Sequence, residues 1–424
     1  MAFLSDTVTA TWGITALATS GLIIRPWRLP EAVWAVLGAT ILVLLGLLPW
    51  QDALAGIRNG LDVYLFLIGM MLLSELARRE GLFDWLATIA VDHARGSPRR
   101  LFTLIYIVGV LVTVFLSNDA TAVVLTPAVY AAARAAGVEP LPYLFICAFI
   151  ANAASFVLPI SNPANLVVFG AQMPPLLSWL GQFALPSIFS IGATYVALRL
   201  CLQGAIGPHV LAATIDKPRL SRGGWLAAAA LGATAISLLS CSAFGFQLGL
   251  PTLLCGSAAV LTIVVIRRQS PWPILKEISW GILPLVAGLF VLVEALAHTG
   301  AIAAINQILS EALARAPADA TWGTSLMLAL ACNLMNNLPV GLIAGSVIAA
   351  DHVPHHIAAA ALIAVDLGPN LSITGSLATI LWLIALRREG QSVQAWRFLR
   401  LGIVIMFPAL ALAILALMVT STRP

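Results

Sequence analysis

Apolar stretches of about 17 to 25 residues recur along this chain, and each is long enough to cross a hydrocarbon core as an α-helix. Of the 424 residues, 60% are hydrophobic and 9% are charged, against about 25% charged in soluble proteins. A soluble protein could not bury so much apolar surface, and a disordered chain would be polar and charged. The stretches also lack the alternation of membrane β-strands. We therefore predict an all-α integral membrane protein.

The apolar stretches predict about ten spans, two of them over-long and interrupted by polar residues. The spans are 11–25, 31–49, 61–78, 101–136, 177–203, 224–242, 249–267, 279–297, 321–350 and 396–420, of which 101–136 and 321–350 are interrupted. Two further apolar pieces, 143–175 and 356–386, break midway at LPISNPAN and DLGPNLSITGS. We predict that these two are re-entrant helical hairpins, because irregular backbone at that depth must be buried in protein or line a cavity.

Lysine and arginine gather in five loops that this layout puts on one side of the membrane. The loops carry Arg25 and Arg28; Arg78, Arg79, Arg95, Arg99 and Arg100; Lys217, Arg219 and Arg222; Arg267, Arg268 and Lys276; and Arg387, Arg388, Arg397 and Arg400. The other side receives Arg58, Arg134, Arg315 and Arg423. By the positive-inside rule the richer side is cytoplasmic and both termini lie outside. We expect a multi-pass protein of the bacterial inner (plasma) membrane, without a cleaved signal peptide.

The sequence contains an internal repeat. One shift of 219 positions carries Gly69 onto Gly288, Glu75 onto Glu294, Gly81 onto Gly300 and Asn118 onto Asn337. Five spans separate the two glutamates, an odd number, so the two halves run through the membrane in opposite directions. Inverted repeats whose broken helices meet near the midplane are the plan of secondary transporters.

The repeat predicts how the chain is divided. We expect N-terminal helices outside the repeat in 1–58, a first inverted repeat in 59–205, linking helices in 206–274 and a second repeat in 275–424. Spans 61–78, 224–267 and 279–297 should form a scaffold and any contact in a homodimer. The interrupted spans should pack with both hairpins as one mobile unit.

The four polar breaks predict the binding site. Polar groups are expensive in lipid unless they are satisfied, so their presence in spans indicates a cavity rather than a lipid-facing surface. The candidate substrate-binding residues are the polar side chains of the breaks: Ser117, Asn118, Thr121, Ser161, Asn162, Asn165, Asn336, Asn337, Thr374 and Ser376.

Two acidic residues are candidates for proton coupling. Asp119 lies mid-span beside a break, with no lysine or arginine nearby in sequence, and Asp366 opens the second predicted hairpin tip. An intramembrane carboxyl in such a place commonly carries a proton. Glu75 and Glu294 lie near helix ends, and we assign them to the scaffold.

Other kinds of function lack support in the sequence. No Walker A loop is present, so the chain alone does not hydrolyse ATP, and the net charge of +4 comes from loop arginines rather than a nucleic-acid patch. The five cysteines form neither a zinc pattern nor a disulfide framework. We expect no cofactor and no metal site, including at Asp351, His352, His355 and His356. An intramembrane enzyme would need a nucleophile–base pair or paired acids, and neither is found.

Four motifs resemble those of the bacterial arsenite efflux permeases, within the ion-transporter superfamily. They are FLSNDATAVVLTPAV (115–129), FIANAASFVLPISNPANLVVFG (149–170), NLMNNLPVGLIAG (333–345) and DLGPNLSITGSLATILWLIAL (366–386). The likeness extends over about 60–420, and the last motif is the most specific to the arsenite branch. The binding region of the family carries over onto Asn118, Asp119, Asn162, Asn165, Asn337, Asp366 and Thr374. This chain has Asn152 where some members have an acidic residue, which shifts a proton role to Asp119.

The resemblance implies export of arsenite and antimonite by proton antiport, with an elevator-type motion of the hairpin domain in the lipid bilayer. It also leaves room for a separate cytosolic arsenite-stimulated ATPase. Arsenous acid is small, neutral and covered with hydroxyls, so Asn, Ser and Thr groups can bind it without a thiolate. The alternatives are a sodium–proton antiporter or a silicic-acid exporter of the same superfamily.

Overall fold

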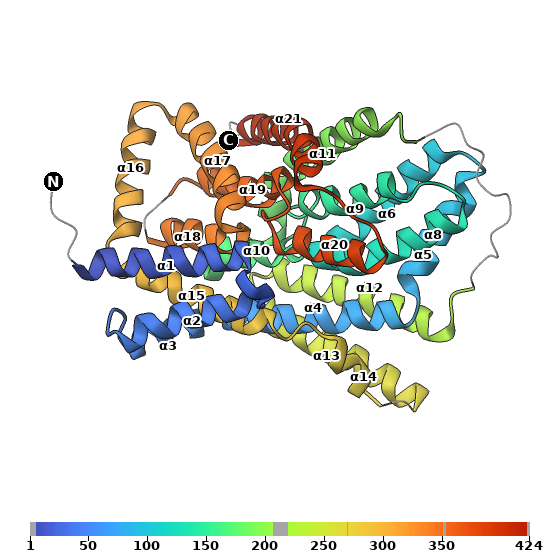
Figure 1. The fold of residues 1–424 in the computed structure, drawn as a ribbon, viewed down its shortest axis with the longest axis horizontal. Coiled ribbons are helices and arrows are strands. Elements are labelled where there is room, and N and C mark those ends of the chain that lie inside the picture. Colours follow the sequence, from blue (N-terminus) through green and yellow to red (C-terminus); the bar gives the residue numbers. More distant parts are fainter. Residues whose placement is uncertain (1–5, 207–218, 269, 351–352, 422–424) are drawn as a thin grey trace.

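The computed structural model describes residues 6–206, 219–268, 270–350 and 353–421, and the regular structure of these residues is entirely helical (Figure 1). Lys217, Asp351, His352 and Arg423 lie outside the described residues. Within these described residues, five helices are long and apolar enough to cross a membrane: α6 (Pro98–Phe115), α11 (Leu176–Leu202), α12 (Arg222–Ala243), α13 (Gly249–Arg267) and α21 (Ala395–Ser421). Two bent pairs meet the same criterion together, α3 (Trp50–Asn59) with α4 (Leu61–Arg79) and α15 (Ile282–His298) with α16 (Ala301–Arg315). The predicted fold class, an all-helical membrane protein with broken helices, is confirmed.

The remaining helices do not meet this criterion of length and apolarity. They are α1 (Asp6–Ile24), α2 (Glu31–Leu44), α5 (Leu82–Ala94), α7 (Asn118–Ala120), α8 (Thr126–Ala135), α9 (Leu141–Ala153), α10 (Pro163–Phe169), α14 (Trp272–Glu277), α17 (Pro317–Met335), α18 (Asn337–Ala350), α19 (His355–Leu367) and α20 (Leu377–Arg388). A π-helix, Thr121–Leu125, joins α7 to α8. Every predicted span and both predicted hairpins contain a helix, whereas α3, α5, α14 and α16 are not among the predicted elements.

Several basic segments meet at one end of the molecule, which we call the basic end. Arg267 at the end of α13 pairs with Glu80 after α4 at 2.7 Å. At the same end, α6 begins beside the start of α9, because the Tyr143 hydroxyl donates to the Pro98 carbonyl at 3.3 Å. The last turns of α11 also reach this place, with the Arg199 guanidinium 5.8 Å from the centre of the Phe102 ring.

Residues 98–135 form a re-entrant hairpin, not a broken span. Only residues 136–140 connect the end of α8 to the start of α9, and five residues reach at most about 18 Å. A straight helical span over 98–135 would hold its ends more than about 50 Å apart. The segment therefore leaves the basic end, turns at Leu116 and Ser117, and returns. We call this turn, residues 116–120, the first tip.

The following piece crosses the molecule instead of returning. Helix α9 starts at the basic end, breaks over residues 154–162, and continues as α10 to the opposite end, where α11 begins. The prediction of a broken span at 101–136 and a hairpin at 143–175 is therefore wrong, and the two roles are exchanged. The physical reason is that both pieces consist of two short apolar helices around a polar break, which is the same sequence pattern.

The second half shows the same exchange at the opposite end. The Gln182 side chain, in the first turns of α11, donates to the His355 carbonyl at 3.0 Å, so α19 begins at the end away from Arg199. Helix α18 arrives there after the turn at Asn336, and α17 starts there directly after α16. Residues 317–350 are therefore the second hairpin, and its turn, residues 333–338, is the second tip.

Helices α19 and α20 form the second broken span. The Trp382 indole in α20 donates to the Leu144 carbonyl at 2.9 Å, near the basic-end start of α9, and α19 begins at the other end. The predicted hairpin at 356–386 is therefore wrong as well. The two observed hairpins open at opposite ends of α11, as an inverted repeat requires; in Figure 1 the first enters from the right and the second from the left.

The helices keep the 219-residue shift seen in the sequence. Helices α5, α6, α7 and α11 begin at 82, 98, 118 and 176, while α16, α17, α18 and α21 begin at 301, 317, 337 and 395. Gly81 and Gly300 precede α5 and α16 with positive φ values of 72° and 82°, a conformation that glycine adopts without steric cost. The division of the chain at residues 59, 206 and 275 stays a prediction.

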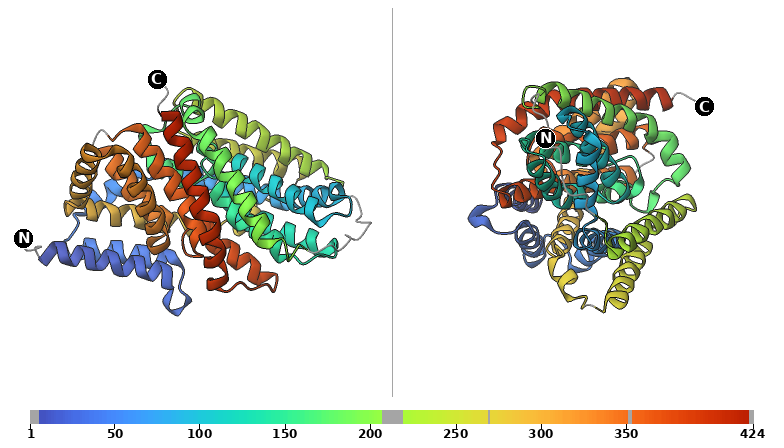
Figure 2. Two further views of the ribbon diagram at one scale, coloured as in Figure 1. Left: turned by 90° about the horizontal axis from the view of Figure 1, so that it is seen from above. Right: turned by 90° about the vertical axis from the view of Figure 1, so that its right-hand side faces the viewer.

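The helices pack in two groups. One contains α1 to α4 with α12, α13 and α15, and the other contains both hairpins, both broken spans, α11 and α21. Figure 2 shows α11 and α21 crossing side by side on the outside of the second group. Gly69 of α4 and Gly288 of α15 allow close helix contact in the first group, because a Cβ there would clash with the backbone of Thr252 and of Ala35.

Candidate functional site

The first tip is built by side chains that cap a new helix inside the protein. The Ser117 hydroxyl accepts the backbone N–H of Ala120 at 3.1 Å, and the Asn118 side-chain oxygen accepts the N–H of Asp119 at 2.9 Å. Thr121 is fully buried and lies 2.8 Å from the hydroxyl of Thr113. Polar residues are needed here because the first N–H groups of a helix have no partner within it.

The first broken span holds its own break with asparagines. Asn165 donates to three carbonyls of the break, those of Ser155, Leu158 and Pro159, at 3.0 to 3.3 Å. Asn162 caps α10 by accepting the N–H of Ala164 at 3.0 Å. Ser161 donates to the Val114 carbonyl at 2.9 Å and thereby ties this break to the first hairpin.

The second tip and the second break are joined directly. The backbone N–H of Asn337 donates to the Gly375 carbonyl at 2.9 Å, and the Asn336 side chain donates to the Thr374 carbonyl at 3.3 Å. Asn336 has a φ of 76°, an uncommon conformation for a residue other than glycine. Ser376 caps α20 by accepting the N–H of Thr379 at 3.1 Å.

The two broken spans hold each other at their breaks. Asn162 of the first donates to Asp366 Oδ1 of the second at 2.8 Å. In the same direction, Asn152 of the first donates to Asn370 Oδ1 at 3.0 Å and to the Thr379 hydroxyl at 3.2 Å in the second. A shift of 214 positions, which relates α9 to α19, carries Asn152 onto Asp366. The two residues are therefore equivalent positions of the two halves, one titratable and one not.

Asp366 is completely buried and has one unpartnered oxygen. Its relative exposure is 0%, and Oδ2 has no hydrogen-bond partner. Among the residues that the structure describes, no lysine or arginine forms an ion pair with it or with Asp119. The side-chain oxygens of Asn152, Asn165 and Asn337 are also buried without a partner.

Two cavities separate the tips from the first helix group. The one at the first tip is about 80 Å³ and lies against the basic-end half of α4 and the start of α15. It is lined by Ser117, Asp119 and Ala120 of the tip, and by Met70, Ser74, Glu75, Glu277, Ile278 and Ser279 among others. The cavity at the second tip is about 20 Å³, and its lining includes Glu31, Asn336 and Thr374.

The predicted site residues differ in whether they line one of these cavities. Ser117, Asp119, Asn336 and Thr374 reach a cavity, whereas Ser161, Asn165 and Ser376 hold the backbone of the breaks. Asn152, Asn333, Asn370, Ser372 and Thr379 complete the polar network, and none of them is among the candidate site residues chosen from the sequence. The 214-residue shift could have identified two of them, because it relates Asn152 to Asp366 and Thr379 to Asn165.

A larger hollow lies at the opposite end of the molecule. It measures about 1,190 Å³ and is lined by residues of α10, α11, α18, α19 and α21. It shares no lining residue with either tip cavity and adjoins residues that the structure does not describe. We assign it no role.

Comparison with known proteins decides the family. The family model described as a citrate transporter matches residues 19–367, most of the chain. The chain belongs to the citrate transporter family. It is accordingly a multi-pass membrane transporter rather than an enzyme.

Individual relatives are similar to the chain at low sequence identity. The chain is 27% identical over 369 residues to an arsenical pump membrane protein of Escherichia coli, covering 82% of this chain and 84% of that protein. It is 24% identical over 426 residues to an uncharacterised transporter of Mycobacterium tuberculosis, covering 94% and 96%. The crystal structure of the YdaH transporter of Alcanivorax borkumensis superposes with a TM-score of 0.57 at 15% identity, covering 87% of each chain. That likeness supports the fold alone.

Proposed function

We propose that this member of the citrate transporter family exports arsenite and antimonite from the cytoplasm in exchange for protons. One observation carries the choice of substrate. Among the described residues that line the two tip cavities there is no lysine, arginine or histidine, and each cavity includes an acidic side chain. The arginines that pair with Glu75 and Glu31 line neither cavity. A citrate anion would therefore find no cation on these walls, whereas a neutral hydroxyl-rich molecule needs none.

The polar groups at the tips suit a small trihydroxy acid. Serine, threonine and asparagine side chains can donate and accept hydrogen bonds, and arsenous acid presents three hydroxyl groups that do the same. A cavity of about 80 Å³ is far smaller than the roughly 300–1,000 Å³ of drug-sized ligand pockets. The 27% identity to the arsenical pump membrane protein of E. coli supports the same class of substrate.

Protons are the proposed driving ion, because a neutral substrate gains nothing from the membrane potential alone. Asp119 faces the cavity at the first tip and is our leading candidate for the coupling group. Asp366 is the second candidate. A buried carboxylate without a neighbouring cation is costly, so we infer that Asp366 is held as the neutral acid in this conformation.

An elevator-type motion would carry the site between the two faces. The support is the packing: the tips and breaks bond to one another, while the cavities lie between the two helix groups. We propose that the group containing both hairpins moves against α4, α12, α13 and α15. By the positive-inside rule the basic end is cytoplasmic, so the first-tip cavity faces the cytoplasm. A homodimer through the scaffold and a partner ATPase stay predictions.

Resistance in a host that lacks its own transporters tests the substrate class. We expect the chain to raise tolerance to arsenite and antimonite, with no effect on tolerance to sodium and no uptake of citrate. Cells carrying Asp119→Asn, with expression in the membrane verified, are the matched control. Sodium tolerance without metalloid tolerance would favour the sodium–proton antiporter, and silicic-acid efflux without either would favour the third alternative.

A further inference from the structure

We propose that Arg79, positioned by Glu75, holds residues 270–280 across the basic-end wall of the first-tip cavity and so regulates entry to it. We call residues 270–280, which include α14, the strap. The proposal rests on the proposed function in one respect, that the first-tip cavity is the cytoplasmic entry site.

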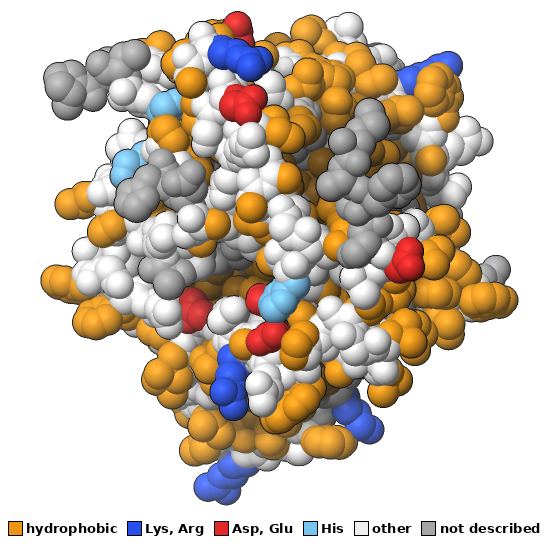
Figure 3. All heavy atoms as spheres, turned by 90° about the vertical axis from the view of Figure 1, so that its left-hand side faces the viewer, with side chains coloured by type: hydrophobic (Ala, Val, Ile, Leu, Met, Phe, Trp, Pro, Cys, Tyr) orange, Lys and Arg blue, Asp and Glu red, His pale blue; other side chains and the backbone are white. Residues whose placement is uncertain are grey.

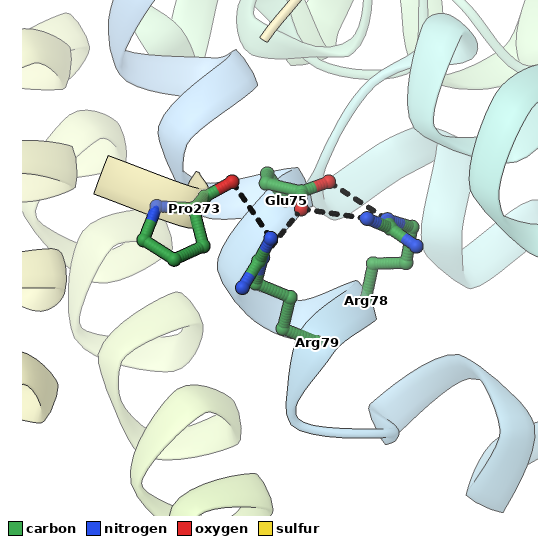
Figure 4. A network of polar contacts seen from close by, with 4 residues as sticks. All are labelled: Glu75, Arg78, Arg79 and Pro273. Carbon is green, nitrogen blue, oxygen red and sulfur yellow. Dashed lines mark hydrogen bonds and ion pairs between the residues drawn. The ribbon is translucent and has the colours of Figure 1, made fainter. Parts of the chain in front are cut away.

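Glu75 organises two arginines around one buried carboxylate (Figure 4). Its side chain is 8% exposed. Arg78 binds both of its oxygens at 2.7 Å, and the Arg79 Nε binds Oε1 at 2.8 Å. The far nitrogen of Arg79, Nη2, then donates to the Pro273 carbonyl of the strap at 2.7 Å. Arg79 thus bridges α4 and the strap, and the bond to Glu75 fixes the plane of its guanidinium.

The strap has few other attachments. Of its side chains, Ile274 and Ile278 are buried, each 6% exposed, while most of the rest are exposed to the surroundings. The Trp280 indole donates to the Leu275 carbonyl at 2.7 Å, a bond within the strap itself. Leu275 is half-buried and also packs on the core. A segment held by three apolar side chains and one charged hydrogen bond opens more readily than a packed helix.

The strap lies where it can control entry. Glu277, Ile278 and Ser279 form part of the wall of the cavity that Ser117 and Asp119 also line. Glu75 lines the same cavity. Release of the Arg79 bond would therefore loosen a wall that faces the first tip, without touching the tip itself.

The opposite end of the molecule has the matching pair but no such bridge. The 219-residue shift carries Glu75 onto Glu294 and Arg79 onto His298, and His298 Nε2 lies 3.6 Å from Glu294 and 3.7 Å from Asp52. Figure 3, which views this end, shows acidic side chains around a histidine near the middle of the face. Among the described residues, His298 reaches Asp52 of α3 and Glu294 of its own helix, and not the backbone of a strap. The described part of the chain therefore carries this bridge at the basic end.

Arg78 provides the matched control for Arg79. It binds the same carboxylate with two hydrogen bonds, but its connection to the strap is the charge of Glu277 rather than a hydrogen bond. Arg79→Gln should release the strap, and Arg78→Gln should leave it in place.

Thiol labelling in everted vesicles tests the proposal without any substrate. Ser74→Cys, at a buried position that lines the first-tip cavity behind the strap, is made in a chain whose Cys201, Cys241 and Cys255 are serine, with the buried Cys147 and Cys332 retained. We expect Arg79→Gln to speed labelling of the cysteine at position 74 by a membrane-impermeant maleimide about tenfold, the factor expected for losing a hydrogen bond to a charged group. Arg78→Gln should change it less than about threefold.

Equal labelling rates in the parent and the Arg79→Gln variant would overturn the proposal, and so would equal acceleration by both substitutions. Glu75→Gln should accelerate labelling as Arg79→Gln does, since it removes the group that orients Arg79. Where arsenite transport is measurable, Arg79→Gln should change KM and leave the maximal rate unaltered. If the chain carries no arsenite at all, the labelling result still decides the role of the strap.

Discussion

Asp366→Asn should leave the protein almost as stable as the parent, because the amide reproduces the shape and the acceptor of a neutral carboxylic acid. The carbonyl oxygen of the new side chain can still accept from Asn162 Nδ2, as Asp366 Oδ1 does at 2.8 Å. The other oxygen has no partner to lose. We expect a loss of less than about 1 kcal/mol, within the range of one neutral hydrogen bond.

Asp366→Ala is the matched comparison. It leaves the Asn162 amide buried without its acceptor, and such a group costs about 1–3 kcal/mol. Thermal unfolding of the purified variants in detergent at about pH 4, followed by tryptophan fluorescence, ranks the three proteins. At that pH an unfolded aspartate is about half protonated, so taking up a proton on folding costs the parent little. The expected order is parent and Asn variant together, with the Ala variant well below. If Asp366→Asn is as destabilised as Asp366→Ala, the carboxyl is ionised in this conformation and our inference of a neutral acid is refuted.

Three further predictions follow from the same geometry. Asp119→Asn should reach the membrane and retain counterflow between equal proton concentrations, but lose pH-driven arsenite uptake; full uptake would move the coupling role to Asp366. Gly69→Ala should lower the thermal stability by about 2 kcal/mol or more, because α4 packs there on the backbone of α13, whereas Gly232→Ala, with open space around it, should not. Arg134→Cys should be labelled from the same side of the membrane as Arg95→Cys; labelling from the opposite side would restore the straight span over 101–136.

Much of the fold follows from the sequence because it depends on local composition. The apolar length of each span and the polar breaks are properties of short stretches of sequence, and each corresponds to a helix or a break in the structure. The 219-residue shift is found by comparing such stretches, and it relates the starts of four pairs of helices. The positions of Gly69 and Gly288 likewise mark real close contacts between helices.

Short stretches of sequence do not show which interrupted segments are re-entrant hairpins and which are broken spans that cross the molecule. The hairpin at 98–135 and the broken span at 141–169 share one pattern, two short apolar helices around a polar turn. Their difference lies in long-range contacts such as Tyr143 with Pro98 and Trp382 with Leu144. The loop charges were compatible with both arrangements, although the observed one moves Arg134 to the basic end.

The candidate site shows the same division. The polar residues of the breaks are visible in the sequence, and Asp119 does face a cavity. The pairing of Asn162 with Asp366 joins residues 204 positions apart and depends on how the two halves meet. Asn152 was noted for its difference from relatives, but its bonds to Asn370 and Thr379 require the folded protein.

Arsenite uptake into proteoliposomes that contain this chain alone tests the central claim most directly. With the cytoplasmic face outward, an acidic interior and the membrane potential clamped, we predict accumulation of arsenite above its external concentration. Collapse of the pH gradient by a proton–potassium ionophore should return it to equilibrium. Accumulation that is the same with and without the gradient, or that requires sodium in place of protons, would contradict proton-driven export of arsenite.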